Sequence, residues 1–384
     1  MKEKQRIAII GSTGSIGCQT LEVIERHGHL FTPVVLTAGS NVELLIQQAI
    51  KWRPRIAVIA DASKYETLRD ALSPVGVEVA AGAEAIAAAA EADYVDTVVT
   101  ATVGYSGLLP TLRAVNAGKR IALANKETLV VAGDIVTEAA RSRNVKIVPV
   151  DSEHSAIYQC LAGEDPSKVS RLIITASGGP FRTFPAERLA TVTAADALRH
   201  PNWSMGAKIT VDSATMMNKA FEIIEARWLF GVEAKRIVPV VHPQSIVHSM
   251  VEFADGSVKA QLGLPDMKLP ISYALSDGLR LEPPFERMTL ERMATLTFEE
   301  PDRERFPAIT LADYALSRGG NTACVINAAN EVAVKAFLQG RIAFTAIYEL
   351  IIDTLARSPF IASPTLDDYI ATNAEARAVA EKLI

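Results

Sequence analysis

The stretch Arg6–Gly17, RIAIIGSTGSIG, decides the fold of the first part of the chain. Its apolar run predicts a buried strand over 6–10, and three glycines then open a helical pattern over about 15–27. Glycines allow a tight turn and a close approach of the backbone to a pyrophosphate, which then lies at the helix N-terminus. A strand, a glycine turn and a helix in this order are therefore typical of a dinucleotide-binding fold, with a purely structural glycine turn as the alternative.

The rest of the first 150 residues continues the alternation of strand and helix. The Ala-rich stretch 80–93 is predicted to be one of the helices, because Glu84 and Glu91 keep it amphipathic. Strands that alternate with helices form parallel sheets, so we predict a Rossmann-like α/β domain over 1–150. Its further strands are predicted over 33–36, 56–60, 97–101, 120–124 and 146–150.

The pattern changes after residue 150. Gly/Pro-rich turns, mixed strands and helices, and a mobile polar loop near 196–206 predict a central α+β catalytic domain over 151–276. Prolines and mixed charge predict a linker over 277–306, and four helical patterns predict a C-terminal four-helix bundle domain over 307–384. Central strands are predicted over 171–176, 237–241, 246–253 and 257–261 with a helix over 214–230, and the last helices over 308–318, 323–338, 342–357 and 366–383.

Composition narrows the class of protein. The chain has 384 residues, 49% of them hydrophobic, and a net charge of -5. These values are typical of a folded protein with a large core, and they give no reason to expect a nucleic-acid partner. No apolar run reaches the ~18 residues of a membrane helix. Three cysteines do not suggest a disulfide framework, and without a recognisable targeting segment we expect a cytoplasmic protein with no membrane partner.

The end of the second strand indicates which dinucleotide binds. NAD-binding folds place an acidic residue there to hold the ribose 2′-hydroxyl. Here the strand end reads Thr37-Ala38-Gly39-Ser40-Asn41, without an acid that would repel a 2′-phosphate. NADP is therefore favoured over NAD, although Ser40 and Asn41 offer only neutral hydrogen bonds.

A pair of carboxylates follows the strand at 146–150. Asp151, Ser152 and Glu153 lie beyond the carboxyl end of a strand, where ligands bind in open α/β sheets. In extended chain the side chains of residues 151 and 153 point the same way, and hard oxygen ligands favour Mg²⁺ or Mn²⁺. A polar turn that caps the next helix is the alternative.

The segment 212–225, DSATMMNKAFEIIE, adds a third carboxylate. On a helix Asn218, Lys219 and Glu222 share one face, because residues three and four apart are neighbours. An ordinary surface helix could carry this pattern, but the Met and Phe residues between them indicate that its other faces are buried. A carboxylate beside an amide and a lysine suits a metal and an anionic substrate.

Three more features suit a ligand. Ser177-Gly178-Gly179 follows a predicted strand and suits a phosphate, with a plain turn as the alternative. The loop 200–206, HPNWSMG, is rich in large residues, which is typical of a lid. Lys126 follows another strand and could contact substrate or cofactor, whereas His242 suits a structural role. Together these features predict an NADP-dependent oxidoreductase acting on a phosphorylated hydroxy-carbonyl compound, with a metal as Lewis acid.

Eight motifs are spread over nearly the whole chain. They are GSTGSIG at 11–17, LANKET at 123–128, PVDSEHSAI at 149–157, ASGGPF at 176–181, HPNWSMGAKITVDSATMMNKAFEIIEA at 200–226, HPQSIVHSMVEF at 242–253, LPDM at 264–267 and NAANEVAV at 327–334. With these motifs the sequence closely resembles the 1-deoxy-D-xylulose 5-phosphate reductoisomerase family. The resemblance implies an NADPH- and metal-dependent enzyme of isoprenoid biosynthesis. The implied reaction rearranges 1-deoxy-D-xylulose 5-phosphate to a branched aldehyde, and NADPH reduces this aldehyde to 2-C-methyl-D-erythritol 4-phosphate.

The resemblance implies roles for individual residues. The metal ligands are Asp151, Glu153 and Glu222, and the catalytic residues are Lys126, Glu153, His200 and Lys219. The substrate contacts are Ser152, Ser177, His200, Trp203, Ser213, Asn218, Lys219, Ser245 and His248. The cofactor contacts are Gly11, Ser12, Thr13, Gly14, Ser15, Ile16, Gly39, Ser40, Asn41, Asn125, Lys126, Glu127, Met205, Gly206 and Met267.

The resemblance also implies a homodimer, and it leaves alternatives. The family often carries a basic residue at the position of Ser40, so the sequence implies the use of NADPH and leaves the strength of its preference over NADH open. A semialdehyde dehydrogenase would need a nucleophilic cysteine, and Cys160 has no obvious activating base near it in the sequence. An NADP-binding sensor would not need three carboxylates and Lys219. A paralogous reductoisomerase with another product would not need the Trp203 loop.

Overall fold

The computed structural model describes residues 3–203, 205–282 and 286–384. Ser204 of the predicted loop and Pro283 and Pro284 of the predicted linker lie outside the described residues. The chain forms two compact units. The first unit comprises Met1–Thr128, Val136–Ser155 and Asp266–Arg287, and the second comprises Leu129–Ile135, Ala156–Pro265 and Met288–Ile384. A division into two units does not test the four segments predicted from the sequence, which stay a prediction.

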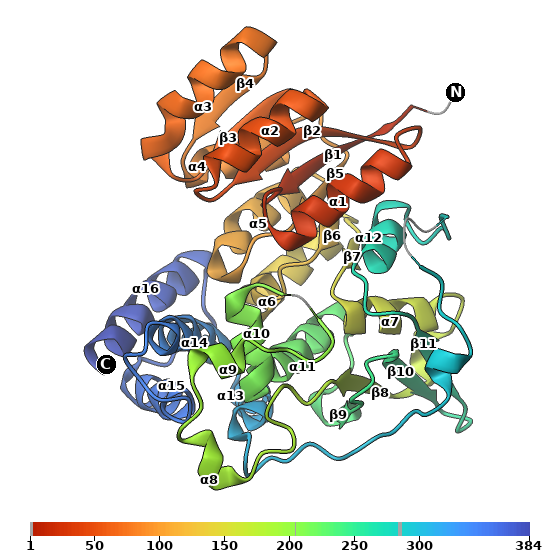
Figure 1. Cartoon of the computed structure of the whole chain (residues 1–384), viewed down its shortest axis with the longest axis vertical. Helices are drawn as coiled ribbons and strands as arrows, with labels where there is room; N and C mark the ends of the chain where they lie inside the picture. Colours follow the sequence, from red (N-terminus) through yellow and green to blue (C-terminus); the bar gives the residue numbers. More distant parts are fainter. Residues whose placement is uncertain (1–2, 204, 283–285) are drawn as a thin grey trace. The chain divides into compact units, whose positions relative to one another are not determined.

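A seven-stranded parallel sheet forms the centre of the first unit, in the order β4-β3-β2-β1-β5-β6-β7 (Figure 1). The α/β class predicted from the glycine turn is confirmed. Ile7, Ile9 and Ile10 have no exposed surface, as expected of a parallel strand covered on both faces. The strands are β1 Gln5–Ile10, β2 Phe31–Ala38, β3 Ile56–Ile59, β4 Glu78–Ala81, β5 Thr97–Thr100, β6 Arg120–Leu123 and β7 Ile147–Pro149.

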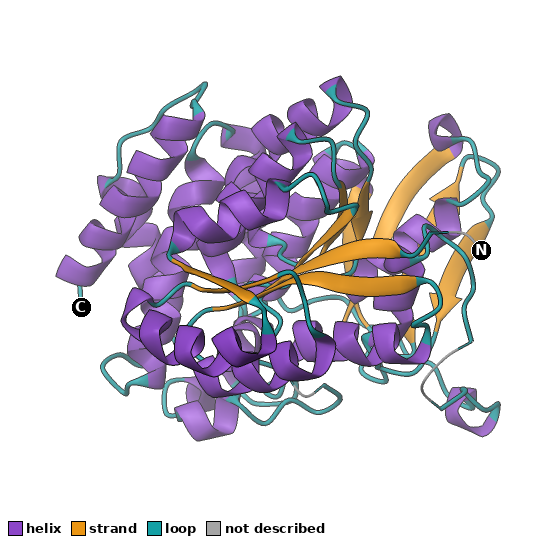
Figure 2. Cartoon of the chain, turned by 90° about the horizontal axis from the view of Figure 1, so that it is seen from above, coloured by secondary structure: helices purple, strands orange, loops and turns teal. Residues whose placement is uncertain are grey.

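Helices connect these strands, as the alternating pattern predicted (Figure 2). The predicted helix over 80–93 is shorter than expected, because β4 takes residues 78–81 and Gly82, with φ of 96°, turns the chain into α4. Strand β4 itself was not predicted. The connecting helices are α1 Ser15–Arg26, α2 Val42–Trp52, α3 Tyr65–Leu72, α4 Ala83–Glu91, α5 Leu108–Asn116 and α6 Glu127–Ser142. Helix α7 Ser152–Leu161 follows β7, and α12 Lys268–Leu275 also belongs to the first unit.

The second unit contains a four-stranded sheet in the order β11-β10-β8-β9. Strand β8 runs parallel to β9 and antiparallel to β10. The strands are β8 Val169–Ala176, β9 Ile237–Val241, β10 Val247–Phe253 and β11 Val258–Leu262, close to their predicted positions. Leu172, Ile174 and Val251 are fully buried in the core that also holds Phe221 of the central helix. Their neighbours Ile173 and Met250, which point the other way, are only half-buried.

The helix predicted over 214–230 is wrong in its extent. Two helices occupy this segment, α10 Ala207–Thr215 and α11 Met217–Phe230. Met216 separates them in the left-handed region, with φ of 64° and ψ of 10°. A residue in this conformation ends a helix, because its peptide groups no longer follow the helical path. The predicted polar loop also loses its first residues to the short helix α9, Ala194–Ala197, which a capping box at Thr193 starts.

The C-terminal helices form the predicted bundle. Helix α14, Thr322–Leu338, packs against the other three. These are α13 Leu311–Arg318, α15 Ala346–Arg357 and α16 Leu366–Lys382. Among the residues that the structure describes, no helix is long and apolar enough to span a membrane.

Candidate active site

The glycine turn after β1 has the geometry that a pyrophosphate requires. Gly11 has φ of 95°, and a Cβ atom there would lie 2.7 Å from the carbonyl oxygen of Ala101. A Cβ atom on Gly17 would overlap the backbone of Gly11. Gly14 is the N-cap of α1 and no side chain caps that end. Backbone N–H groups at the start of α1 can therefore bind an anion, and the turn fits a dinucleotide.

The end of β2 is joined to this turn. The amide of Gly11 donates to the hydroxyl of Thr37 at 2.9 Å, and the buried Ser12 hydroxyl bonds Gln48 at 2.7 Å. Asn41 accepts from the amide of Leu44 and so caps α2, while Ser40 is exposed. Two neutral residues are assigned to the cofactor here. The side chain of Asn41 already accepts a hydrogen bond from the backbone amide of Leu44, whereas the exposed Ser40 hydroxyl can bind a ligand without breaking such a bond.

Asn125, Lys126 and Glu127 open α6. Asn125 is buried, donates to the carbonyl oxygen of Gly104 at 2.9 Å and accepts from the amide of Thr128 at 3.0 Å. These bonds fix the loop between β6 and α6. Lys126 is also buried, so its side chain is held by its surroundings. The cation therefore has a defined position at the carboxyl end of the sheet.

The first two candidate metal ligands lie in the first unit, after β7. The ammonium of Lys126 lies 2.7 Å from Asp151 Oδ2, and the His154 ring lies 3.6 Å from the same oxygen. Burial opposes the charge on Asp151, but Lys126 and His154 outweigh it and hold the pKa of this carboxyl far below its usual value. Asp151 is therefore a carboxylate at neutral pH, as a metal ligand must be.

The local geometry around these ligands differs from the prediction. The extended geometry expected of residues 151–153 is wrong, because α7 begins at Ser152. Asp151 instead occupies the position before the helix, where its Oδ1 accepts from the amide of Ser152 at 3.1 Å. The Ser152 hydroxyl donates to the carboxylate of Glu153. Capping of a helix, raised as the alternative to metal binding, thus coexists with a cluster of carboxylates.

The third candidate ligand lies in the second unit, on α11. Glu222 is fully buried, receives a hydrogen bond from the amide of Asn218 and is ion-paired with Lys219. The face predicted from their spacing is confirmed. Lys219 also donates to the carbonyl oxygen of Thr175, near the end of β8. A buried carboxylate is tolerated here because a cation and an amide satisfy it.

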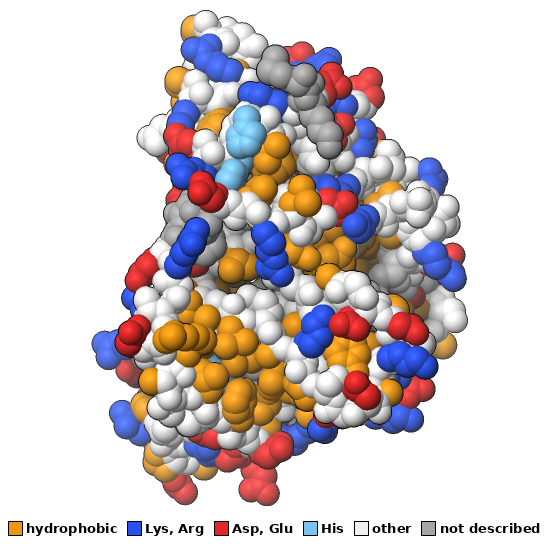
Figure 3. Space-filling model, turned by 90° about the vertical axis from the view of Figure 1, so that its right-hand side faces the viewer, with side chains coloured by type: hydrophobic (Ala, Val, Ile, Leu, Met, Phe, Trp, Pro, Cys, Tyr) orange, Lys and Arg blue, Asp and Glu red, His pale blue; other side chains and the backbone are white. Residues whose placement is uncertain are grey.

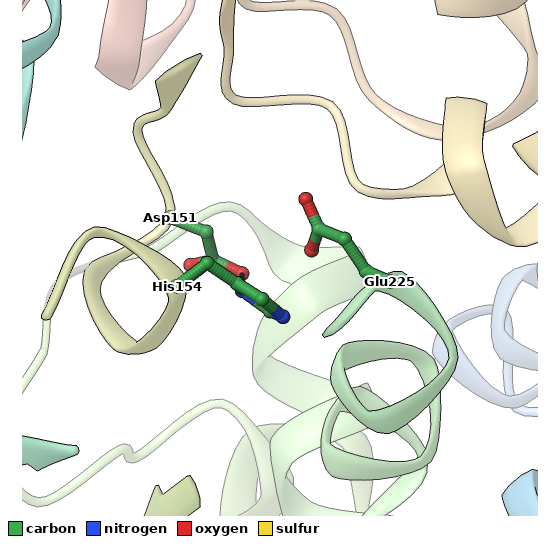
Figure 4. Close-up of side chains that lie close together, drawn as sticks. All are labelled: Asp151, His154 and Glu225. Atoms are coloured by element: carbon green, nitrogen blue, oxygen red, sulfur yellow. Dashed lines mark ion pairs between the residues drawn. The ribbon is translucent and has the colours of Figure 1, made fainter. Parts of the chain in front are cut away.

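Two residues near these ligands were not predicted from the sequence. His154 lies three residues after Asp151 on α7, and Glu225 lies three residues after Glu222 on α11. Both are fully buried. Figure 4 shows their side chains with that of Asp151 and the elements from which they come. The spacing of three residues from each ligand is the signal that could have identified them.

The loop after β8 brings three predicted substrate contacts together. His200 Nδ1 accepts from the amides of Asn202 and Trp203, at 3.2 and 3.0 Å. Its ring therefore carries hydrogen on Nε2, which donates to the Ser177 hydroxyl at 3.0 Å. Gly179 has φ of 69°, and a Cβ atom there would lie 2.7 Å from the carbonyl oxygen of Ser213. The loop of Ser177, Gly178 and Gly179, which we call the predicted phosphate loop, therefore packs closely on α10 only because residue 179 is glycine.

The loop at 200–206 contacts the second predicted wall of the site. The side chain of Asn202 donates to the Ser245 hydroxyl at 2.8 Å. The rings of Trp203 and His248 lie 6.0 Å apart. Gly206 ends the loop as the N-cap of α10. The predicted wall and the predicted lid are therefore in contact within the second unit.

The assigned site residues fall into both units. The first unit holds the glycine turn, the β2 end, Asn125, Lys126, Glu127, Asp151, Ser152, Glu153 and Met267; the second holds Ser177, His200, Trp203, Met205, Gly206, Ser213, Asn218, Lys219, Glu222, Ser245 and His248. The dinucleotide turn belongs entirely to the first unit. The phosphate loop and its surroundings belong to the second.

Comparison with known proteins gives one family. The family model of 1-deoxy-D-xylulose 5-phosphate reductoisomerase matches residues 7–133. The model of the 1-deoxy-D-xylulose 5-phosphate reductoisomerase C-terminal domain matches residues 147–230, and the model of the DXP reductoisomerase C-terminal domain matches residues 262–379. The chain is 55% identical to the 1-deoxy-D-xylulose 5-phosphate reductoisomerase of Bacteroides fragilis over 382 residues, which cover 100% of the chain and 98% of the relative. The Chloroherpeton thalassium enzyme is 51% identical, over 97% of the chain and 96% of the relative.

Solved structures agree. The Zymomonas mobilis 1-deoxy-D-xylulose 5-phosphate reductoisomerase in complex with NADPH has a TM-score of 0.92 and 45% identity, over 99% of each chain. A DOX-P reductoisomerase in complex with NADPH, fosmidomycin and magnesium has a TM-score of 0.94 and 38% identity, over 98% of each chain.

Proposed function

Because the chain belongs to the 1-deoxy-D-xylulose 5-phosphate reductoisomerase family, we propose how its own residues perform the family's reaction. The protein is an NADPH- and divalent-metal-dependent enzyme of isoprenoid biosynthesis. It converts 1-deoxy-D-xylulose 5-phosphate to 2-C-methyl-D-erythritol 4-phosphate. The observation in this chain that carries the account is the buried Lys219–Glu222 pair, anchored at Thr175 two residues before the phosphate loop.

The glycine turn fits the cofactor, and the related Zymomonas mobilis structure is a complex with NADPH. Bound NADPH supplies the hydride. We assign its contacts to the glycine turn, to the β2 end and to the start of α6, with the nicotinamide near Met205, Gly206 and Met267. Backbone N–H groups of α1 hold the pyrophosphate, and the absence of an acid at 37–41 leaves room for a 2′-phosphate.

The donor set fits a hard cation. We propose that Asp151, Glu153 and Glu222 hold Mg²⁺ or Mn²⁺, because all three are carboxylates and Asp151 stays ionised at neutral pH. The bound metal supplies a Lewis acid for the carbonyl and hydroxyl oxygens of the substrate. Lys126 and Lys219 each lie against one of these carboxylates and fix its position.

The phosphate loop binds and orients the substrate. The Ser177 hydroxyl accepts from His200 Nε2 and from the amide of Gly179, so its own hydrogen can be donated to a phosphate oxygen. We assign Ser213, Asn218, Lys219 and Ser245 to the remaining phosphate and hydroxyl contacts. The neutral His200 ring holds the lid backbone and the phosphate loop together, and Trp203 excludes water from the reacting atoms.

We also propose a homodimer. The outer face of the second sheet carries Ile173, Val238, Val240 and Met250, half-buried, and the exposed Val258 on the edge strand. Figure 3 shows hydrophobic side chains gathered on the side of the molecule where Figure 1 places β11. Such a face is typical of a surface that another protein covers. A cytoplasmic location is proposed as well, supported by the low cysteine content of three in 384 residues.

The reaction is tested by following NADPH absorbance with 1-deoxy-D-xylulose 5-phosphate and Mg²⁺, with and without a chelator. NADPH consumption that stops on chelation is expected. Parallel assays with NADH measure how strongly the protein prefers NADPH over NADH when the neutral Ser40 stands at the end of β2. No consumption by protein that binds NADPH would contradict the assignment and favour a sensor or a paralogous enzyme.

A further inference from the structure

A short strap lies at the edge of the second sheet, beside β9. We use this name for Thr297, Phe298 and Glu299, which lie in the segment predicted to be a plain linker. The strap pairs with the free edge of β9: the amide of Val241 donates to the carbonyl oxygen of Glu299 at 2.8 Å. The amide of Glu299 donates back to Val241 at 2.9 Å. The strap is therefore fixed to the sheet as a single antiparallel bridge.

The side chains of the strap hold the turn that follows β9. His242 is fully buried, and its Nδ1 donates to the carbonyl oxygen of Thr297 at 2.8 Å. The ring of Phe298 stacks on the His242 ring, with centroids 4.8 Å apart and planes 19° apart. Thr297 Oγ1 accepts from the Gln244 side chain at 2.8 Å. The structural role predicted for His242 stays a prediction, and the strap supplies the contacts of its Nδ1 and of its ring face.

This turn carries a predicted substrate contact in a strained conformation. Ser245 has φ of 51°, which a non-glycine residue adopts only when its surroundings hold it there. Its amide donates to the carbonyl oxygen of His242 at 3.1 Å, and its hydroxyl accepts from Asn202 of the lid. Because Thr297 of the strap is hydrogen-bonded to both His242 and Gln244, the strap fixes the position of the Ser245 hydroxyl that follows them.

The strap also reaches the phosphate loop. Glu299 receives two hydrogen bonds from Arg182, at 2.7 and 2.9 Å. Arg182 in turn lies against Gly178: a Cβ atom on this glycine would lie 2.6 Å from Arg182 Cδ. Arg305, six residues after the strap, donates to the carbonyl oxygen of Arg182 at 3.0 Å. The strap thus fixes the rear of the loop that presents Ser177.

We propose that the strap is a positioning element that holds the Ser177 loop and the Ser245 turn in register for the phosphate of the substrate. The inference rests on the proposed function, which supplies the phosphorylated substrate. Thr297, Phe298 and Glu299 do not touch this substrate; they act through His242, Gln244 and Arg182. Small displacements of positioning groups reduce binding and turnover without unfolding a protein.

Two variants with matched controls test the proposal. Phe298→Leu removes the ring stacked on His242, and Phe360→Leu is its control, because the two rings are 45% and 44% exposed. Glu299→Gln removes the charge that binds Arg182, and Glu164→Gln is its control, since Glu164 pairs with Lys259 at the surface. KM for 1-deoxy-D-xylulose 5-phosphate, KM for NADPH, kcat, the inhibition constant of fosmidomycin and the melting temperature are measured for each.

The strap variants are expected to raise KM for the substrate and the inhibition constant of fosmidomycin about three- to tenfold. This is the change in affinity expected when the displaced turn or loop weakens one hydrogen bond to the ligand. KM for NADPH should stay unchanged, and the two controls should match the wild type. Equal substrate KM in strap variants and controls would overturn the proposal, as would parallel changes in both KM values. A wild type that consumes no NADPH would instead contradict the proposed function.

Discussion

Lys219 and Glu222 lie one helical turn apart on α11, and the ammonium of Lys219 is ion-paired with the buried carboxylate of Glu222. The same ammonium binds the carbonyl oxygen of Thr175, at the end of β8. One lysine therefore connects a candidate metal ligand to the strand that presents the phosphate loop. This relationship joins a proposed metal ligand to the strand before the proposed phosphate loop, within the second unit.

Replacing Glu222 should separate catalysis from cofactor binding. Glu222→Gln keeps the volume of the side chain and removes the charge that a cation requires, so kcat should fall about a hundredfold or more. The cofactor turn lies in the first unit, so the dissociation constant of NADPH, measured by fluorescence titration, should not change. Glu164→Gln, on the surface of the same unit, is the control. Loss of NADPH affinity in Glu222→Gln would count against the assignment.

The conformation of Gly11 predicts a strong effect of a single methyl group. Gly11→Ala places a Cβ atom against the backbone of Ala101 at a φ of 95°, and should cost about 1–3 kcal/mol of stability. NADPH binding should weaken because the turn must shift. Gly28→Ala is the control, since the nearest atom to its Cβ would be 3.6 Å away. Thermal unfolding and NADPH titration of both variants check this, and equal behaviour would show that the turn tolerates a side chain.

The depressed pKa of Asp151 predicts how stability depends on pH. A carboxyl whose pKa is lowered in the folded state stabilises the fold above the unfolded pKa, about 4, and this contribution disappears as the pH falls through the lower folded pKa. Wild type and Asp151→Asn are compared by chemical denaturation in chelator. The difference in free energy of unfolding should be constant from pH 8 to about pH 5 and shrink only in more acidic solution. The comparison is repeated with His154→Asn in both proteins, so that this imidazole cannot titrate; a difference that then changes near pH 6–7 would show that Lys126 does not lower the pKa of Asp151.

The lid residue Trp203 predicts a kinetic effect. Trp203→Ala leaves the reacting atoms open to water and removes the ring beside His248, so kcat/KM for the substrate should fall about tenfold or more. The KM for NADPH should change less than the KM for the substrate. Trp52→Ala in the first unit, far along the chain at the end of α2, is the control. Unaltered steady-state kinetics for Trp203→Ala would exclude the lid.

The sequence predicted features that depend on local chemistry. The glycine turn required a strand before it and a helix after it, and both are present. Asn218, Lys219 and Glu222 share a face because helical spacing places them there. These predictions rested on periodicity and on residue types within a few positions of one another.

Other features depend on contacts between distant residues, which spacing does not reveal. Thr297 binds Gln244, 53 positions away, so the strap could not be separated from a plain linker. The break at Met216 has no glycine or proline to mark it, so helical spacing alone predicts one continuous helix through this residue. His154 and Glu225 differ from these cases, because each stands three residues from a predicted ligand; what the spacing does not reveal is that both side chains are fully buried.

The identity of the product shows whether this protein rearranges the carbon skeleton of its substrate before reducing it. Purified protein is incubated with 1-deoxy-D-xylulose 5-phosphate, NADPH and Mg²⁺, and the product is identified by NMR spectroscopy. The account predicts 2-C-methyl-D-erythritol 4-phosphate, whose branched carbon skeleton requires rearrangement before reduction. A linear pentitol phosphate, formed by direct reduction of the ketone, would contradict it.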